Sequence, residues 1–310
     1  MALSSMLCSA VTMLAQPPVQ PIRPIPRPRP STLTLPLSRE NFPFDFTFGA
    51  STSALQIEGA SNNHCKGPNI WDDFILKFPD LDPYVTIFHF DLPQALQEKY
   101  GGVLGAEFID DYVAFADLCF EKFGKKVKKW ITMNEPLIFC NGYTGSFPPL
   151  RSSEWQNIRG SVGGDAAVEP YIASHNLLLA HAAAVKRYRD CYKNPVSKEE
   201  IGITLNSAWY VPYSDHKDDK EAALRALDFS LGLYLNPITY GDYPESVRSL
   251  VGNRLPKFTQ EQSDLLRKSY DFIGLNYYHA YYAANDPTIN NPPSFKTDSL
   301  VRNTSKNSLL

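Results

Sequence analysis

The stretch W-I-T-M-N-E-P, residues 130–136, places an amide and a carboxyl side by side at the end of a short apolar run. A run of this kind predicts a buried β-strand. Pro136 ends the pairing of that strand, because proline has no backbone N–H to donate. Asn134 and Glu135 are therefore expected at a strand's end, where barrel enzymes carry their catalytic side chains. A lone match is more often a polar turn without a function, so its meaning depends on the rest of the chain.

The bulk composition limits the classes of protein to consider. The chain has 310 residues and a net charge of −3, which fits one large α/β barrel or two ordinary domains. This charge does not indicate binding to nucleic acid or to an anionic membrane surface, and no apolar run is long enough to span a membrane. The five cysteines are scattered without a Cys-x-x-Cys pair, so neither a metal site nor a disulfide framework is predicted.

Strand candidates alternate with amphipathic helices from residue 46 onward, which favours a parallel α/β architecture. Five of the strand candidates end in polar side chains, namely Gln56, His89, Asn134 with Glu135, Asn206, and Asn276 with Tyr278. Several such endings together predict a pocket at the carboxyl end of a barrel. Neutral hydrogen-bonding groups suit sugar hydroxyls and one carboxyl suits proton transfer, so the residue types alone point to sugar chemistry.

The two ends of the chain differ from its middle. Residues 1–40 hold no acid before Glu40 and are rich in proline and arginine, which predicts an extended segment without a core. Its composition favours a plastid transit peptide, with secretion, vacuolar delivery or an untargeted tail as alternatives. Residues 41–285 are expected to form the folded part. Residues 286–310 are polar and are expected to be a loop or tail, with a sequon at Asn303.

With these segments in view, the chain resembles the plant β-glucosidases of glycoside hydrolase family 1. The matching segments include F-T-F-G-A-S-T-S-A-L-Q-I-E-G-A, K-G-P-N-I-W-D-D-F, V-T-I-F-H-F-D-L-P-Q-A-L, W-I-T-M-N-E-P, G-D-Y-P-E-S-V and D-F-I-G-L-N-Y-Y. They occur in the family's order between residues 46 and 283. The resemblance implies a (β/α)₈ TIM barrel and retaining hydrolysis of β-glucosides, a reaction that needs carboxyls and water but no cofactor or metal.

The resemblance also implies roles for six residues. Glu135 is the expected general acid/base, and Asn134 is expected to contact the sugar 2-hydroxyl. Gln56 and His89 would hold the outer hydroxyls of the glycone. Tyr278 would donate to the nucleophilic carboxylate, and Asn276 would shape the same site. Retaining hydrolysis requires that second carboxyl at about 5–5.5 Å from the acid/base.

The sequence departs from its family at two places. Members carry the nucleophile in a Thr-Glu-Asn-Gly segment after the strand that ends at Tyr278, and the 310 residues hold no such segment. Upstream, Asp82 joins almost directly to Pro83, where members place a strand of the type Arg-Phe-Ser-Ile-Ser-Trp between two helices. The barrel is therefore expected to be incomplete, with strands one, three, four, five and six represented and strands two, seven and eight missing.

Two classes of function follow from these departures. The first is a β-glucosidase by family, whose substrate is a small β-glucoside and whose 310 residues are expected to be inactive for want of the nucleophile. The second is a non-catalytic sugar-binding or regulatory isoform, either as a homo-oligomer or in association with full-length homologues. An incomplete gene model is a third interpretation. The aglycone is set by loops and is not predicted.

Overall fold

The computed structural model describes residues 42–46, 49, 83–145, 147–151, 163–193, 196 and 198–304. The chain divides into two compact units, residues 1–52 and 53–310. In the first unit the rings of Phe42 and Phe46 lie 4.9 Å apart. The predicted N-terminal segment 1–40, with its targeting role, and the predicted site residue Gln56 lie outside the described residues. The second unit carries the rest of the predicted site.

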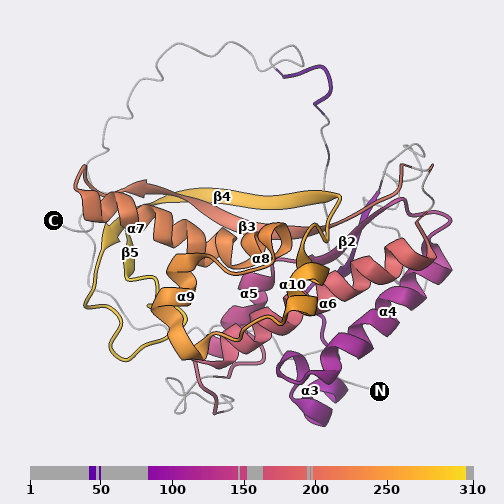
Figure 1. Ribbon diagram of the computed structural model, residues 1–310, viewed down its shortest axis with the longest axis horizontal. Coiled ribbons are helices and arrows are strands. Elements are labelled where there is room, and N and C mark those ends of the chain that lie inside the picture. The colour runs from indigo at the N-terminus through magenta and orange to yellow at the C-terminus, as the bar shows by residue number, and fades with distance from the viewer. Residues whose placement is uncertain are drawn as a thin grey trace, which may run out of the picture. The chain divides into compact units, whose positions relative to one another are not determined.

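The second unit is built on a five-stranded sheet in the order β1-β2-β3-β4-β5 (Figure 1). Its parallel strands are β1 (Tyr84–Phe88), β2 (Lys129–Asn134), β3 (Glu200–Pro212) and β4 (Phe272–Asn285). The last strand, β5 (Val301–Thr304), pairs antiparallel with the end of β4. Helices connect each parallel strand to the next, which is the alternation that the sequence predicts. In order, β1 to β4 are the predicted barrel strands three to six.

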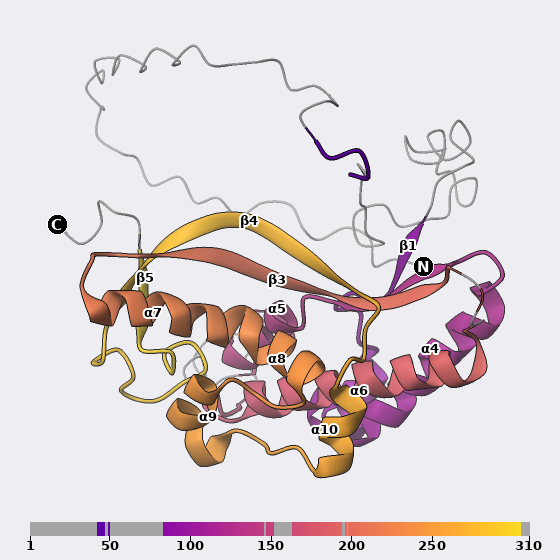
Figure 2. The same cartoon turned by 45° about the horizontal axis from the view of Figure 1, so that its top comes forward.

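The helices that follow β1 and β2 lie on one side of the sheet (Figure 2). After β1 come α3 (Gln94–Tyr100), η2 (Gly102–Leu104) and α4 (Glu107–Phe123). After β2 come α5 (Pro136–Cys140), η3 (Asn141–Thr144) and α6 (Glu169–Cys191). None of the described helices is long and apolar enough to cross a membrane.

The sequence pattern of α4 explains which face it buries. Its four buried residues are spaced four apart, at Phe108, Tyr112, Ala116 and Phe120, and this spacing puts them on one side of an α-helix. That side packs on the sheet, where Phe120 meets the strand residue Trp130 with ring centroids 5.2 Å apart. The helix thereby holds β2 from the outside.

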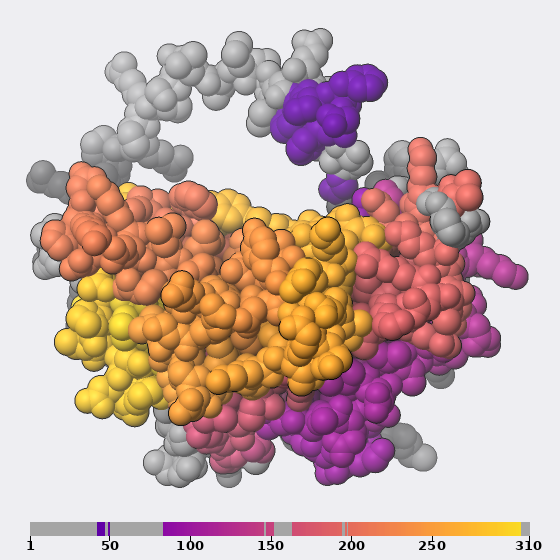
Figure 3. All heavy atoms as spheres, in the orientation of Figure 1, coloured from indigo at the N-terminus to yellow at the C-terminus, as the bar shows by residue number. Residues whose placement is uncertain are grey.

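Between β3 and β4 the chain forms a longer helical layer. Its elements are α7 (Lys217–Leu227), a π-helical turn η5 (Asp228–Gly232), α8 (Leu233–Tyr240), α9 (Glu245–Val251), η6 (Gly252–Arg254) and α10 (Gln260–Leu266). Their atoms, in orange, make up much of the face seen in Figure 3. The sequence predicts one helix from about Asp218 to Leu235. A π-helical turn divides it, and in that turn the hydroxyl of Ser230 donates to the carbonyl of Ala226.

The sheet is strongly curved. The rings of Tyr84 on β1 and Phe272 on β4 meet edge to face with centroids 5.2 Å apart, although β2 and β3 lie between their strands. Three strand spacings in a flat sheet amount to about 14 Å. The strands therefore curve around an interior. Lys129 Nζ lies 4.6 Å from the centroid of the Tyr84 ring.

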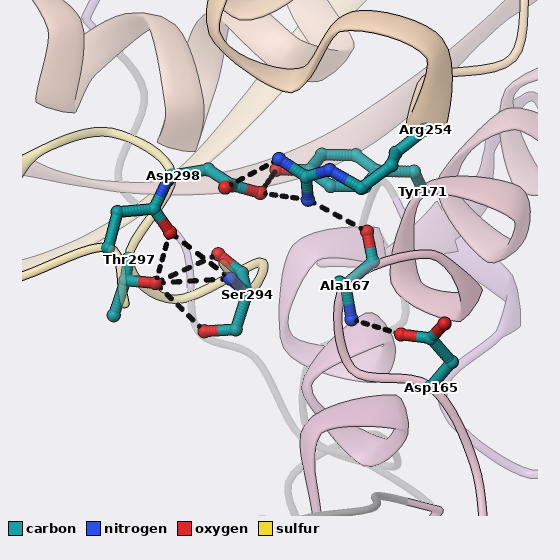
Figure 4. Close-up of polar contacts among 8 residues, drawn as sticks. Asp165, Ala167, Tyr171, Arg254, Ser294, Thr297 and Asp298 are labelled. Carbon is teal, nitrogen blue, oxygen red and sulfur yellow. Dashed lines mark hydrogen bonds and ion pairs between the residues drawn. The ribbon is translucent and has the colours of Figure 1, made fainter. Parts of the chain in front are cut away.

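The segment that follows β4 is anchored to the helical layer. The sequence predicts a loop or tail from Asp286 onward, whereas the structure places β5 there and buries Asp298 completely. Arg254 donates to both carboxylate oxygens of Asp298 at 2.7 Å, and Tyr171 donates its hydroxyl at 2.8 Å (Figure 4). Local sequence patterns do not predict this network, because the three residues are distant along the chain.

Candidate active site

Four of the predicted site residues form one hydrogen-bonded row that crosses the carboxyl ends of β1 and β2 and the interior of β4, a strand that continues to Asn285 beyond its predicted end at Tyr278. Asn276 Nδ2 donates to Glu135 Oε1 at 2.6 Å and to Asn134 Oδ1 at 3.2 Å. Asn134 Nδ2 in turn lies 3.2 Å from His89 Nε2. With the amide nitrogen as the donor, His89 accepts at Nε2 and carries its proton on Nδ1. The row joins β1, β2 and β4, and it leaves Glu135 Oε2 for another partner.

The backbone explains how two consecutive residues, Asn134 and Glu135, join the same row. In a regular strand, neighbouring side chains point to opposite faces. The pairing of β2 with β3 shifts register between Ile131 and Asn134, and Glu135 has the left-handed φ of 43°. A non-glycine residue in that region costs about 1–2 kcal/mol. Such strain at a carboxyl is typical of a functional position.

Thr132 anchors β2 two residues before the row begins at Asn134. It is completely buried, and its Oγ1 lies 2.7 Å from His181 Nδ1 on α6 and 3.2 Å from the carbonyl oxygen of Gly202 on β3. The Tyr112 hydroxyl on α4 donates to the Thr132 carbonyl. Burial lowers the pKa of His181 to about 3, so its ring is neutral and structural. These contacts fix the strand two residues before Asn134.

Asn206 on β3 is a further candidate site residue, outside the six to which the resemblance gives roles. It lies in register with Asn276 on the neighbouring strand. Its Oδ1 is buried and has no hydrogen-bond partner in the described part of the chain. A buried acceptor without a partner is unfavourable, and a ligand hydroxyl can satisfy it. The signal in the sequence is a polar residue after the apolar run 201–205, although β3 itself continues to Pro212.

Tyr278 is placed differently from the other predicted residues. It follows Asn276 by two positions on β4 and therefore lies on the same face of the strand. Its side chain is 76% exposed, and its hydroxyl makes no hydrogen bond to any described residue. The predicted contact to a nucleophilic carboxylate stays a prediction, as do the roles of the other five residues.

Aromatic rings line one side of the row. Phe90, next to His89, has a positive φ of 73° and its ring meets that of His89 at 4.9 Å. The ring of Phe147 lies 5.6 Å from that of Phe90. Aromatic faces beside hydrogen-bonding groups suit a sugar ring, which has both polar edges and apolar C–H faces.

Comparison with known families decides the classification. The model of "Glycosyl hydrolase family 1" matches residues 38–80 and 76–309. The chain belongs to this family. The two matched segments meet at residues 76–80, beside the junction at Asp82 and Pro83 where the sequence departs from the family pattern. The family's (β/α)₈ barrel accounts for the curved parallel sheet, which is part of such a barrel.

The family's curated plant members include similar proteins. The chain is 40% identical to the cyanogenic beta-glucosidase of Trifolium repens over 333 aligned positions, which cover 84% of this chain and 78% of the relative. It is 51% identical to beta-glucosidase 12 of Oryza sativa subsp. indica over 222 positions, which cover 71% and 43%. The alignment to the Trifolium repens protein is longer than the chain itself, so that relative has residues without a counterpart here.

Solved structures of the family agree with the fold. The rice Os3BGlu6 beta-glucosidase superposes with a TM-score of 0.70 at 36% identity and matches 75% of this chain. A beta-glucosidase from the fungus Humicola insolens, solved in complex with glucose, gives a TM-score of 0.67 at 38% identity. The chain spans about half the length of both, 50% and 49%.

A separate cavity lies in the helical layer. It has a volume of about 580 Å³ and is lined by residues between Gly241 and Ser263, from the end of α8 to α10. None of the row residues lines it. The functional site is assigned to the strand ends on geometry and chemistry. No cluster of three or more metal-ligating side chains occurs among the described residues.

Proposed function

We propose that the chain binds the glycone of a small β-glucoside at the row formed by His89, Asn134 and Asn276, with Glu135 as its general acid/base. The observation that carries this proposal is the 2.6 Å hydrogen bond between Asn276 and Glu135, which fixes a carboxyl among neutral hydrogen-bonding groups. Asn134 would contact the 2-hydroxyl, and His89 with Gln56 would hold the outer hydroxyls. The fold and the family support this assignment.

We also propose that the 310 residues alone do not hydrolyse the glucoside. Retention requires a carboxylate that attacks the anomeric carbon from the face opposite the leaving group, at about 5–5.5 Å from the acid/base. Glu135 can protonate the departing oxygen, but the Thr-Glu-Asn-Gly segment that would supply the nucleophile is not in the sequence. Without it no glycosyl-enzyme intermediate forms.

Two measurements on the purified 310-residue chain test the two parts separately. Calorimetry with 1-deoxynojirimycin, a glucose-shaped cation, should detect binding that Asn134→Ala weakens by about tenfold, the loss of one or two hydrogen bonds. No binding to the unsubstituted chain would remove the glycone site. Release of nitrophenol from 4-nitrophenyl β-glucoside should not exceed that of Glu135→Gln. Turnover that Glu135→Gln abolishes would overturn the proposed inactivity.

The plastid address of residues 1–40 also stays a proposal. Its support is the acid-free, arginine-bearing composition. Fusing these residues to a fluorescent protein in leaf cells should direct it to plastids, and accumulation in the vacuole or outside the cell would favour the secretory alternative.

A further inference from the structure

The proposed function makes no use of the cavity in the helical layer. This cavity has a volume of about 580 Å³ and is lined by residues between Gly241 and Ser263. Figure 2 shows α9 and α10 on the side of the layer that faces away from β3 and β4. Small-molecule sites in proteins have volumes of about 300–1,000 Å³. The cavity is therefore large enough for a ligand of its own, in a place separate from the row.

Part of the lining is apolar and is held in place by stacked rings. Tyr243 and Leu255 are buried. The ring of Phe258 stacks against His175 at 4.3 Å and against Tyr243 at 4.7 Å. The Tyr243 hydroxyl also lies 3.0 Å from Nδ1 of His175, so the three rings fix one another. A preformed apolar surface of this kind suits a flat ligand body.

The charged part of the lining has an excess of positive charge. Its charged side chains are Arg248, Lys257 and Asp242, two positive and one negative. Arg248 pairs with Asp242, and the other oxygen of that carboxylate accepts from the Tyr243 N–H at 2.8 Å. Lys257 is exposed and forms no ion pair with any described residue. Its ammonium group and the remaining N–H groups of Arg248 can bind an anion.

We propose that this cavity is a second binding site, for a small organic carboxylate with a flat apolar body. The carboxylate would accept from Lys257, with Arg248 adding to the positive potential, and the body would lie against Phe258 and Leu255. Inorganic phosphate would leave the apolar lining in contact with water. A neutral ring would gain nothing from the two positive side chains, and a cation would be repelled by them.

Calorimetry with 4-hydroxybenzoate on the purified 310-residue chain tests the site without sugar or turnover. We expect this anion to bind about tenfold more tightly than 4-hydroxybenzyl alcohol, in which a neutral group replaces the carboxylate. It should also bind about tenfold more tightly than inorganic phosphate, which has no apolar body. Saturating 1-deoxynojirimycin should leave the affinity for 4-hydroxybenzoate unchanged, because none of the row residues lines the cavity.

Matched lysine variants locate the bound carboxylate. Lys257→Met keeps the length of the side chain and removes its charge, so it should weaken binding of 4-hydroxybenzoate about fivefold. Lys257→Arg keeps the charge and should bind as the unsubstituted chain does. Lys126→Met is the control, since Lys126 is also exposed but lies in the turn after α4, outside the cavity. Equal thermal denaturation midpoints would show that the variants are folded.

Four outcomes would overturn the proposal. The first is no detectable binding of 4-hydroxybenzoate, and the second is equal affinity for this acid and for the alcohol. The third is equal weakening by Lys257→Met and Lys126→Met. The fourth is displacement of 4-hydroxybenzoate by 1-deoxynojirimycin, which would place the acid at the row. None of these outcomes bears on glycone binding, which calorimetry with 1-deoxynojirimycin alone decides independently.

Discussion

Asn276 holds Glu135 across a sequence separation of 141 residues, with 2.6 Å between its Nδ2 and the carboxylate Oε1. Asn276 lies within β4 and Glu135 directly follows β2, and β3 runs between these two strands. The contact exists because the sheet curves enough for side chains on non-adjacent strands to meet, as the rings of Tyr84 and Phe272 also do. The position of the Glu135 carboxyl therefore depends on β4 as much as on its own strand.

Removing the Asn276 side chain is expected to weaken binding of the glucose-shaped cation. Asn276→Ala deletes two hydrogen bonds that orient Glu135 and Asn134, and a hydrogen bond to a charged group contributes about 1.5–3 kcal/mol when buried. The site is partly exposed, so we expect about a tenfold loss of affinity in calorimetry. Asn303→Ala, at an exposed position on β5, is the control and should bind as the unsubstituted chain does.

The left-handed backbone at Glu135 predicts an unusual order of stability among substitutions. Glycine adopts a φ of 43° without strain, whereas the Cβ of alanine contacts the backbone at this angle. Glu135→Gly should therefore be more stable than Glu135→Ala by about 1 kcal/mol. In a helix or strand the order is the reverse. Midpoints of urea denaturation measure the difference, and an alanine variant at least as stable as the glycine variant would refute the strain.

Stability should fall on acidification because of His175. Its ring stacks on Phe258 at 4.3 Å and bonds the Tyr243 hydroxyl at 3.0 Å, and burial lowers its pKa to about 4. The folded ring stays neutral while the unfolded one takes up a proton below its ordinary pKa of about 6.5. The free energy of unfolding should thus decrease as the pH falls from about 6.5 to about 4, by about 1.4 kcal/mol per pH unit from this residue.

The variant His175→Phe isolates that contribution, since it keeps the stacked ring and removes the titration. Its denaturation midpoints at a series of pH values should fall less steeply than those of the unsubstituted chain between pH about 4 and 6.5. It also leaves the Tyr243 hydroxyl without a partner, which lowers stability equally at every pH. Parallel curves for the two proteins would contradict the prediction.

The two arginine–carboxylate pairs should differ in importance. Arg254→Met leaves Asp298, a fully buried carboxylate, with only the Tyr171 hydroxyl, and losing one partner of such a pair costs about 3–5 kcal/mol. Arg187→Met removes the pair with Asp117, whose side chains are 44% and 31% exposed, and exposed pairs contribute about 0–1 kcal/mol. Thermal denaturation compares them, and equal effects would mean that the Asp298 network does not anchor residues 286–304.

Sequence patterns predicted the elements whose signal is local. Pro170 predicts the start of the long helix α6. The four-residue spacing of apolar residues predicts the long helix α4. Thr259 and Gln262 have the spacing that predicts a capping box, and they form one at α10, with hydrogen bonds of 3.2 and 2.9 Å between side chain and backbone. The π-helical turn at η5 was not predicted. The packed segment before β5 escaped prediction because Asp298 is held by Arg254 and Tyr171, which are far from it in the sequence.

By itself the sequence determined the family, the alternation of strands and helices, and the polar residues at the strand ends, since each depends on neighbouring residues in order. Only the tertiary structure decided which of those ends meet. It brought His89, Asn134, Glu135 and Asn276 into one row and left Tyr278 exposed on β4. The physical reason is sheet curvature, which depends on contacts such as Tyr84 with Phe272 between strands far apart in the chain.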